Sequence, residues 1–331
     1  MARTQKQRSG NIDNTGFGAN SNAEGGRLVN PDGSINLKKT GFAIWKRISI
    51  YHSLLRMKRS HFFLAILVFY TGINIIFAAI YFAIGVEHLS GIDQSRSTFD
   101  EVMSAFFFSS QTLTTVGYGH VAPTGMLTNI VASTESLLGI LAFAVVTGLI
   151  YGRFSRPKAY ILFSDNILIA PYKGGKALML RVATYKNNHL TEVEAQITIA
   201  LHLNEGGKMV TRFYPAALEI AQVNSLALNW TMVHNITEDS PLYQYSLAEL
   251  TEARIEVMVY IKAFDDHFSN TVQQRTSYTH QQLIYGARYV PMFERSPDGD
   301  YTVLELDKIS AYEPAELPDT IAVSSAQETG R

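Results

Sequence analysis

Two long apolar segments divide the chain into regions with different patterns of hydrophobic and polar residues. Residues 62–86 contain no charged side chain, and residues 130–152 contain only one, Glu135. At about 1.5 Å of rise per residue, a helix over either segment is longer than the roughly 30 Å hydrocarbon core of a bilayer. The pattern therefore predicts two membrane-spanning helices, over residues 61–86 and 129–153.

The pattern changes after residue 156, where short runs of alternating apolar and polar residues are separated by turns rich in Gly, Asn and Asp. Many short strands with almost no helical periodicity are typical of a β-sandwich of the immunoglobulin type. We therefore expect an all-β domain over residues 156–312. Its strands are expected over residues 159–163, 166–170, 178–184, 192–201, 256–261 and 301–306.

The ends of the chain and the segment before the first span differ in composition. Residues 1–40 are rich in Gly, Asn and Ser, which cannot bury a core, so we expect them to be disordered or extended. The tail, residues 313–331, is also expected to be disordered. Residues 41–60 place apolar side chains at helical spacing with Lys and Arg on other faces, as an amphipathic helix on the membrane surface requires. The charges at the end of this helix predict a bend before Phe62.

About 40 residues connect the two spans, and they contain the signals of a short helix followed by a loop. Thr98 and Glu101 have the spacing of a capping box, which predicts a helix over residues 99–111 with Thr98 as its N-cap. Non-helical backbone at membrane depth is tolerated only where protein or pore water covers it. We therefore expect the connection to enter the membrane and return, as a pore helix and a re-entrant loop.

The loop contains Thr115-Val116-Gly117-Tyr118-Gly119, in which the backbone carbonyls are the candidate functional groups. Gly117 and Gly119 can adopt the positive φ that other residues resist, so that successive carbonyls can point the same way. Four copies around one axis would then stack rings of oxygens that replace the water around a potassium ion, and the Thr115 hydroxyl would add the lowest ring. The segment therefore predicts a potassium selectivity filter, with K+ bound at Thr115, Val116, Gly117 and Tyr118.

Five positions on the second span are candidates for supporting or gating a pore. Phe143, Thr147 and Tyr151 recur every four residues, so they share one helix face that is expected to line the pore. Tyr151 is either a hydrophobic gate at the end of that face or a member of the interfacial aromatic belt. Glu135 is costly inside a membrane unless it is paired, so we expect it to support the filter from behind by hydrogen bonds. Gly139 is a candidate hinge, although close helix packing explains a glycine there about as well.

Basic residues are distributed unevenly around the two spans. Eleven Lys and Arg residues precede the first span, only Arg96 lies between the spans, and Arg153, Arg156 and Lys158 follow the second. Because Lys and Arg are enriched on the cytoplasmic side of spans, both termini are expected to be cytoplasmic. The absence of cysteine excludes disulfides and thiolate metal sites. No HExxH, GxSxG or P-loop pattern is present, so we do not expect an enzyme. We also expect no nucleic-acid partner.

The chain resembles the inward rectifier potassium channel family, and more closely its prokaryotic members, over roughly residues 27–313. The filter alone would indicate only a potassium channel, but segments outside it also match the family. These segments are residues 27–34 (RLVNPDGS), 51–55 (YHSLL), 135–139 (ESLLG), 153–158 (RFSRPK), 230–234 (WTMVH), 240–242 (SPL) and 274–278 (QRTSY).

The resemblance implies a homotetramer with one filter, a gate where the inner helices meet, and a cytoplasmic vestibule formed by four β domains. It implies that Tyr151 is the gate and Gly139 the hinge. It also places Asp265 and Asp266 in a narrow cytoplasmic loop. There the two residues form either an acidic ring that concentrates cations or an ordinary solvated turn.

The resemblance further implies partners and a location. Arg153, Arg156 and Lys158 match the linker where family members meet anionic phospholipids, although basic residues flank most spans. Strong rectification in the family uses an acidic residue midway along the inner helix, where Phe143 stands here, so we expect only weak block by cytoplasmic Mg²⁺ or polyamines. No cofactor is expected beyond K+ as the permeant ion, and the location implied is a bacterial plasma membrane.

Two other classes of protein compete with this interpretation. A two-span channel with a Rossmann-like regulatory domain would contain a GxGxxG motif after a strand, which this sequence lacks. A membrane-anchored binding module remains possible, because a β-sandwich can hold a ligand without a recognisable motif. Tetramerisation with ion flux separates a channel from such a module.

Overall fold

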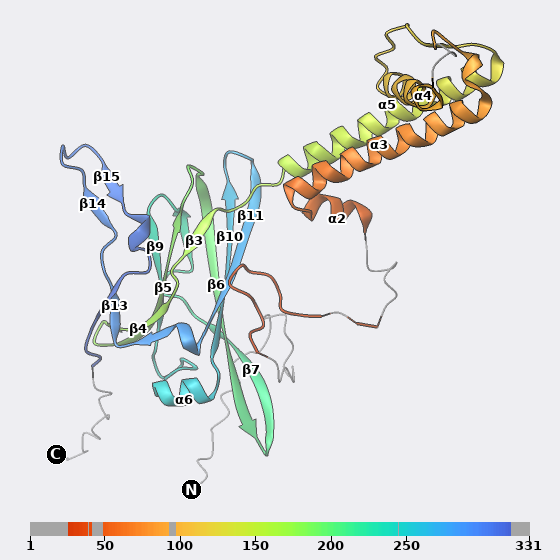
Figure 1. Ribbon diagram of the computed structural model, residues 1–331. Coiled ribbons are helices and arrows are strands. Elements are labelled where there is room, and N and C mark those ends of the chain that lie inside the picture. The colour runs from red at the N-terminus through yellow and green to blue at the C-terminus, as the bar shows by residue number, and fades with distance from the viewer. Residues whose placement is uncertain (1–25, 39, 42–48, 93–96, 244, 319–331) are drawn as a thin grey trace, which may run out of the picture. The chain divides into compact units, whose positions relative to one another are not determined.

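The computed structural model describes residues 26–38, 40–41, 49–92, 97–243 and 245–318. The chain folds as two compact units (Figure 1). One unit, Thr40–Arg156, is helical, and the other combines Met1–Lys39 with Pro157–Arg331. Each unit is described separately below.

Two helices of the helical unit are long and apolar enough to cross a membrane, α3 (Arg59–Ile84) and α5 (Met126–Phe154). They confirm the two predicted spans with shifts of one to three residues at their ends. α3 begins directly after Lys58, and it ends at Gly85, whose φ of 115° an L-residue rarely adopts. The helix α4 (Thr98–Leu113) lies between the spans in sequence, as the predicted pore helix does.

The start of α4 differs from the prediction. Ser97, not Thr98, is the N-cap: its backbone is extended, and its side chain accepts a hydrogen bond from the N–H of Asp100. Thr98 is therefore the first residue inside the helix, and the predicted capping box with Glu101 is wrong. Ser97 has the same capping chemistry as Thr98 one position earlier, so the sequence could not separate the two. Short strands β1 (Leu89–Ser90) and β2 (Ala122–Pro123) pair and close the connection on either side of α4.

The predicted helix before the first span is present as α2 (Ile50–Arg56), with Ser49 as its N-cap. Residues 42–48 of the predicted helix lie outside the described residues. The predicted bend falls at Met57 and Lys58, which both have an extended ψ of 148° and separate α2 from α3. We call this turn the α2–α3 corner.

The second unit is a sandwich of two five-stranded sheets, which confirms the predicted fold class (Figure 1). In one sheet the strand order is β11-β10-β6-β7 with β8 beside β6, and in the other it is β12-β4-β5-β3 with β9 beside β5. Buried side chains from both sheets, such as Leu180, Ile199 and Val257, form one continuous core. Most of them alternate with more exposed residues along their strands, which is the period-two pattern of the sequence.

The strands of the first sheet are β6 (Leu190–Glu205), β7 (Lys208–Ala216), β8 (Gln222–Ser225), β10 (Glu256–Asp265) and β11 (Asn270–Thr279). Those of the second are β3 (Ile161–Phe163), β4 (Ile167–Tyr172), β5 (Gly175–Thr184), β9 (Asn229–Asn235) and β12 (Leu283–Tyr285). Two further antiparallel pairs follow: β13 (Ala287–Tyr289) pairs with β16 (Tyr312–Pro314), and between them in sequence β14 (Phe293–Arg295) and β15 (Thr302–Leu304) form a hairpin; α6 (Leu247–Glu252) precedes β10.

Part of the N-terminal segment packs against the sandwich rather than remaining free. The buried carboxylate of Glu256 accepts hydrogen bonds from the backbone N–H groups of Leu28, at 2.8 Å, and Val29, at 3.0 Å. Val29 is buried against Phe213 and Met258. The expectation of disorder therefore does not hold for this part, while residues 1–25 lie outside the described residues. At the other end, β16 extends the ordered chain past residue 313, and residues 319–331 lie outside the described residues.

Candidate functional site

The predicted filter has an alternating backbone conformation. Thr115, Gly117 and Gly119 have positive φ values of 58°, 51° and 76°, whereas Val116 and Tyr118 between them do not. This alternation is the conformation that lets successive carbonyls of an extended segment point to one side. Thr115 adopts it without being a glycine, which costs about 1–2 kcal/mol and indicates that its surroundings impose the shape.

The N–H groups of the filter bond back to the C-terminal end of α4. Those of Val116 and Gly117 both donate to the carbonyl of Gln111, at 3.0 and 3.3 Å, and that of Thr115 donates to the carbonyl of Thr112. These amides satisfy carbonyls that the helix end would otherwise leave without partners. Rings of oxygens around one ion would require further copies of the chain.

Glu135 lies at the centre of a buried network that joins three helices. Its side chain is 0% exposed and accepts hydrogen bonds from the Tyr81 hydroxyl on α3, at 2.6 Å, and from the Ser109 hydroxyl on α4, at 2.5 Å. Asn74, also on α3, lies 3.0 Å from the Ser109 hydroxyl and donates to the Tyr70 carbonyl. Both carboxylate oxygens of a costly buried group are therefore paired, which fixes α4 between the two long helices.

Sequence analysis identified Glu135 but missed its partners. Asn74, Tyr81 and Ser109 are not among the predicted site residues. A signal was present, because Asn74 and Tyr81 stand seven residues apart and so share one face of the first span. Polar groups on one face of a span indicate a hydrogen-bonding partner on a neighbouring helix.

Gly139 is in close contact with the end of α4. A Cβ built on Gly139 would overlap the backbone carbonyl of Leu113, directly before the filter. The glycine is buried and lies inside a regular helix. This geometry favours close helix packing, the alternative left open by the sequence, and the hinge stays a proposal. Gly148, further along α5, has no neighbour within 4 Å of such a Cβ.

The face predicted to line a pore is open in the single chain. Phe143 and Tyr151 are 74% and 73% exposed, and Thr147 between them is exposed as well. Phe143 also borders a cavity of about 470 Å³ that reaches Thr115 and Leu113 at the base of the filter. Its other lining residues include Ile66, Phe69 and Tyr70 of α3, so the cavity lies between the two long helices, and of the three residues predicted to line the pore only Phe143 borders it.

The three basic residues after the gate position have different surroundings. The Arg153 guanidinium donates hydrogen bonds to the carbonyls of Leu54, at 3.2 Å, and Met57. Arg156 and Lys158 are exposed. Only the latter two have side chains free to meet a headgroup.

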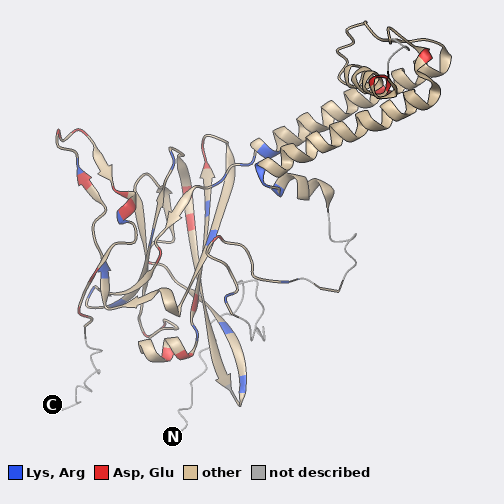
Figure 2. Ribbon diagram, viewed as in Figure 1, with Lys and Arg blue, Asp and Glu red and all other residues tan. Residues whose placement is uncertain are grey.

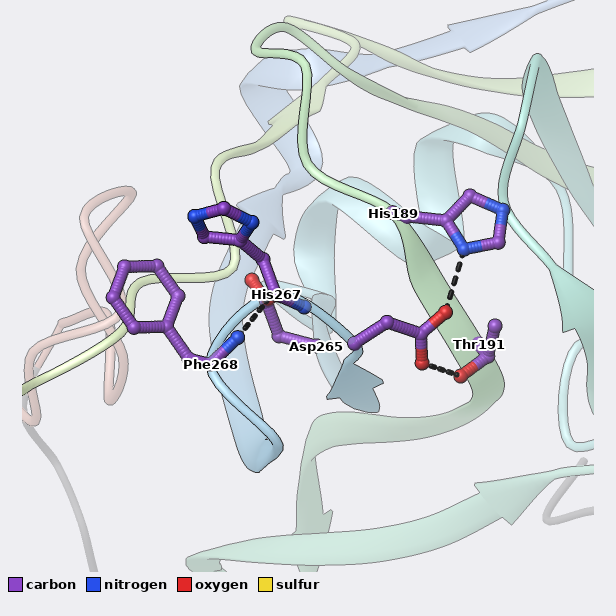
Figure 3. Close-up of polar contacts among 6 residues, drawn as sticks. His189, Thr191, Asp265, His267 and Phe268 are labelled. Atoms are coloured by element: carbon purple, nitrogen blue, oxygen red, sulfur yellow. Dashed lines mark hydrogen bonds and ion pairs between the residues drawn. The ribbon is translucent and has the colours of Figure 1, made fainter.

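The two acidic residues of the predicted ring also differ (Figure 3). Asp265 is 0% exposed, and its Oδ1 accepts hydrogen bonds from the N–H groups of His267 and Phe268, so it stabilises the turn between β10 and β11. Such a buried carboxylate does not face water, which removes Asp265 from the proposed ring. Asp266 is exposed and bonds to His189, at 2.6 Å, and to Thr191. The hydrogen bond from His189 lowers the pKa of the Asp266 carboxyl, which keeps it charged.

Charged residues gather at the two ends of the helical unit, and the lengths of the spans are almost free of them (Figure 2). Arg56, Lys58, Arg59 and Arg153 lie near the α2–α3 corner, and Glu87, Asp100 and Glu101 lie in the connection between the spans. The basic end is the one that the positive-inside rule assigns to the cytoplasm.

Two spans that enclose a pore helix and a filter-type loop, followed by a β-sandwich, define a two-span potassium channel with a β-rich C-terminal domain. Two family models match the chain: "Ion channel" over residues 69–156 and "Inward rectifier potassium channel C-terminal domain" over residues 161–329. The chain belongs to the inward rectifier potassium channel family. It is an ion channel and not an enzyme.

Individual relatives agree with this assignment. The chain is 32% identical to the inward rectifier potassium channel Kirbac3.1 of Paramagnetospirillum magnetotacticum over 277 residues, which cover 82% of this chain and 91% of the relative. It is 29% identical to the inward rectifier potassium channel irk-1 of Caenorhabditis elegans, covering 62% of this chain and 40% of the relative. It is 27% identical to the G protein-activated inward rectifier potassium channel 2 of Pongo abelii, covering 61% and 50%.

Proposed function

We propose that four copies of this chain form a potassium-selective channel in which residues 115–119 are the filter. Channels of this family are tetramers, and four columns of carbonyls around one axis supply the rings that replace the water around K+. The alternating φ at Thr115, Gly117 and Gly119 is the observation that best supports the proposal. The amides that bond to α4 support it further, because they leave the carbonyls as the free polar groups.

The rest of the pathway follows from the inner helix. Phe143, Thr147 and Tyr151 line a cavity below the filter, and four Tyr151 rings close it as a hydrophobic gate. Gly139 acts as a hinge at which the inner helix bends, while the glycine itself stays in contact with α4. In the β-sandwich, Asp266 of each chain contributes to a negative ring that concentrates cations.

The channel resides in a bacterial plasma membrane with both termini in the cytoplasm. The basic residues near the α2–α3 corner support this orientation. Arg156 and Lys158 bind anionic phospholipid headgroups, each basic side chain contributing about 1 kcal/mol near the surface. Anionic lipid therefore regulates the channel.

The test of this function is potassium flux from liposomes that contain the purified protein. We expect efflux of K+ but not of Na+, blocked by barium, in vesicles that contain anionic phospholipid. Equal fluxes of K+ and Na+ would contradict the filter. Absence of any flux across several anionic lipid mixtures, with a tetrameric mass, would contradict conduction and favour a pore-like sensor.

Weak rectification leads to a prediction at Phe143. Replacing Phe143 by Asp places four carboxylates in the cavity, where they attract a polyvalent cation. We expect cytoplasmic spermine to block the Phe143→Asp channel with about 100-fold higher affinity, which corresponds to about 3 kcal/mol. The measurement is outward current in a planar bilayer with increasing spermine.

The matched control is Phe143→Asn, which has nearly the shape of Asp without its charge. It should leave the spermine affinity near that of the native channel. Steep block of the native channel at micromolar spermine would contradict the proposal of weak rectification.

A further inference from the structure

Arg153 makes three contacts with the corner between α2 and α3. Its guanidinium donates to the carbonyls of Leu54 and Met57, and it lies over the ring of Phe62, 5.0 Å from the ring centroid. Arg153 is in the last turn of α5, two residues after Tyr151. One side chain thus connects the gate end of the inner helix to the start of the first span.

The carbonyls that Arg153 contacts belong to groups that need such a partner. Leu54 is in the last turn of α2, where carbonyls have no N–H four residues further along the helix. A cation at the C-terminal end of a helix also interacts favourably with the helix dipole. The guanidinium donates to the two carbonyls from two separate nitrogens while its central carbon lies over the Phe62 ring, whereas all the donors of a lysine ammonium are on one nitrogen and cannot reproduce this geometry.

The surrounding packing brings α2 directly onto α5. Leu55 is 6% exposed and Phe62 is 1% exposed. A Cβ on Gly152 would lie 3.4 Å from the Tyr51 hydroxyl and 3.7 Å from Leu55 Cδ2. The helix that precedes the first span therefore rests on the turn of α5 that contains Tyr151, and Arg153 closes this contact with hydrogen bonds.

We propose that Arg153 is a positioning residue that holds α2 against the turn of α5 that contains Tyr151, and so sets the position of the gate. The inference rests on the proposed function and assigns Arg153 a role different from that of Arg156 and Lys158. Those two residues meet lipid headgroups, whereas the Arg153 guanidinium is occupied by protein carbonyls and by Phe62. Arg156 and Lys158 thus bind lipid, whereas Arg153, in the same linker, positions the turn that contains Tyr151.

The test measures potassium flux from liposomes in which the fraction of anionic phospholipid is increased stepwise. It compares three variants of the full-length protein, Arg153→Gln, Arg153→Lys and Arg156→Gln. We expect both Arg153 variants to lower the maximal flux about tenfold, the effect of losing one charge-assisted hydrogen bond, with an unchanged half-maximal lipid fraction. Arg156→Gln should raise the half-maximal fraction and leave the maximum unchanged. Normal flux in Arg153→Lys, together with a shifted lipid fraction in Arg153→Gln, would overturn the proposal and make Arg153 a headgroup ligand.

A second measurement does not depend on conduction. Because the chain has no cysteine, His52→Cys on the exposed face of α2 provides one site for a spin label. We expect Arg153→Gln, and to a smaller degree Phe62→Leu, to increase the mobility of this label, whereas Arg156→Gln leaves it unchanged. Unchanged mobility in Arg153→Gln would overturn the inference. Since this result stands whether or not the protein conducts, failure of the proposed function would be recognised separately, by absent flux in the native protein.

Discussion

Replacing Gly117 by alanine is expected to abolish potassium-selective flux. The φ of Gly117 is +51°, and a Cβ in this conformation costs about 1–2 kcal/mol per chain, or roughly 4–8 kcal/mol for four chains that must adopt it together. No atom lies within 4 Å of such a Cβ, so the effect arises from the backbone and not from a clash within the chain. The carbonyl before or after residue 117 would turn away from the axis, and one ring of oxygens would be lost. The measurement is K+ and Na+ efflux from liposomes.

A matched control is available in the β-sandwich. Gly174, in the turn between β4 and β5, has a φ of +77° and also has no atom within 4 Å of a Cβ. Gly174→Ala therefore carries a similar backbone penalty far from the filter in sequence, and it should retain selective flux. A Gly117→Ala channel that still prefers K+ over Na+ would show that residue 117 does not have to adopt this conformation, which would contradict the filter geometry.

Replacing Glu135 by leucine is expected to disrupt the pore domain. The substitution leaves the buried Tyr81 hydroxyl without its acceptor, at about 1–3 kcal/mol, whereas the Ser109 hydroxyl keeps Asn74 Oδ1 as an acceptor at 3.0 Å. Over four chains the loss is roughly 4–12 kcal/mol, which is comparable to the stability of many domains. We therefore expect a strongly reduced fraction of tetramer after purification, and flux at background. Size-exclusion chromatography with flux from the same preparation measures both.

Two companion variants make the cause of this loss testable. Tyr81→Phe removes one hydrogen bond and leaves the carboxylate paired with Ser109, so it should be milder than Glu135→Leu. The double variant Tyr81→Phe with Glu135→Leu removes the donor together with its acceptor, and it should recover part of the tetramer, because Ser109 keeps Asn74 as a partner and no hydroxyl is left unpaired. A Glu135→Leu protein with native tetramer content and flux would contradict the role of this network.

The broad architecture could be predicted because its signals are long or periodic. Two apolar segments of more than twenty residues, of which only the second contains a charged residue, Glu135, and a period-two pattern after residue 156 have few alternative folds. Strand β11 (Asn270–Thr279) was indicated only by the family resemblance of residues 274–278, because much of its sequence is polar, although it pairs with β10 along its whole length. In β11 the side chain of Tyr278 is buried, whereas those of Gln273 and Arg275 are exposed. Hydrophobicity alone therefore did not mark the segment as a strand.

The site was less predictable where function depends on the partner of a residue. Glu135 was identified because a carboxylate in a span is costly, but its partners Tyr81 and Ser109 are 54 and 26 residues away in sequence. The burial of Asp265 and the contacts of Arg153 could not be predicted either. A sequence does not show which of two neighbouring acids turns inward, or which carbonyls a guanidinium will contact. Gly139 was left open between a hinge and close packing, and only the position of Leu113 favours the second.

The most direct test of the account is the reversal potential of the channel in a planar bilayer, with K+ on one side and Na+ at equal concentration on the other. A filter formed by residues 115–119 predicts a reversal potential displaced by at least about 120 mV towards the K+ equilibrium value, which corresponds to a roughly 100-fold preference for K+. A reversal potential near zero, in a protein that conducts as a tetramer, would show that the pore does not select K+ and would contradict the central claim.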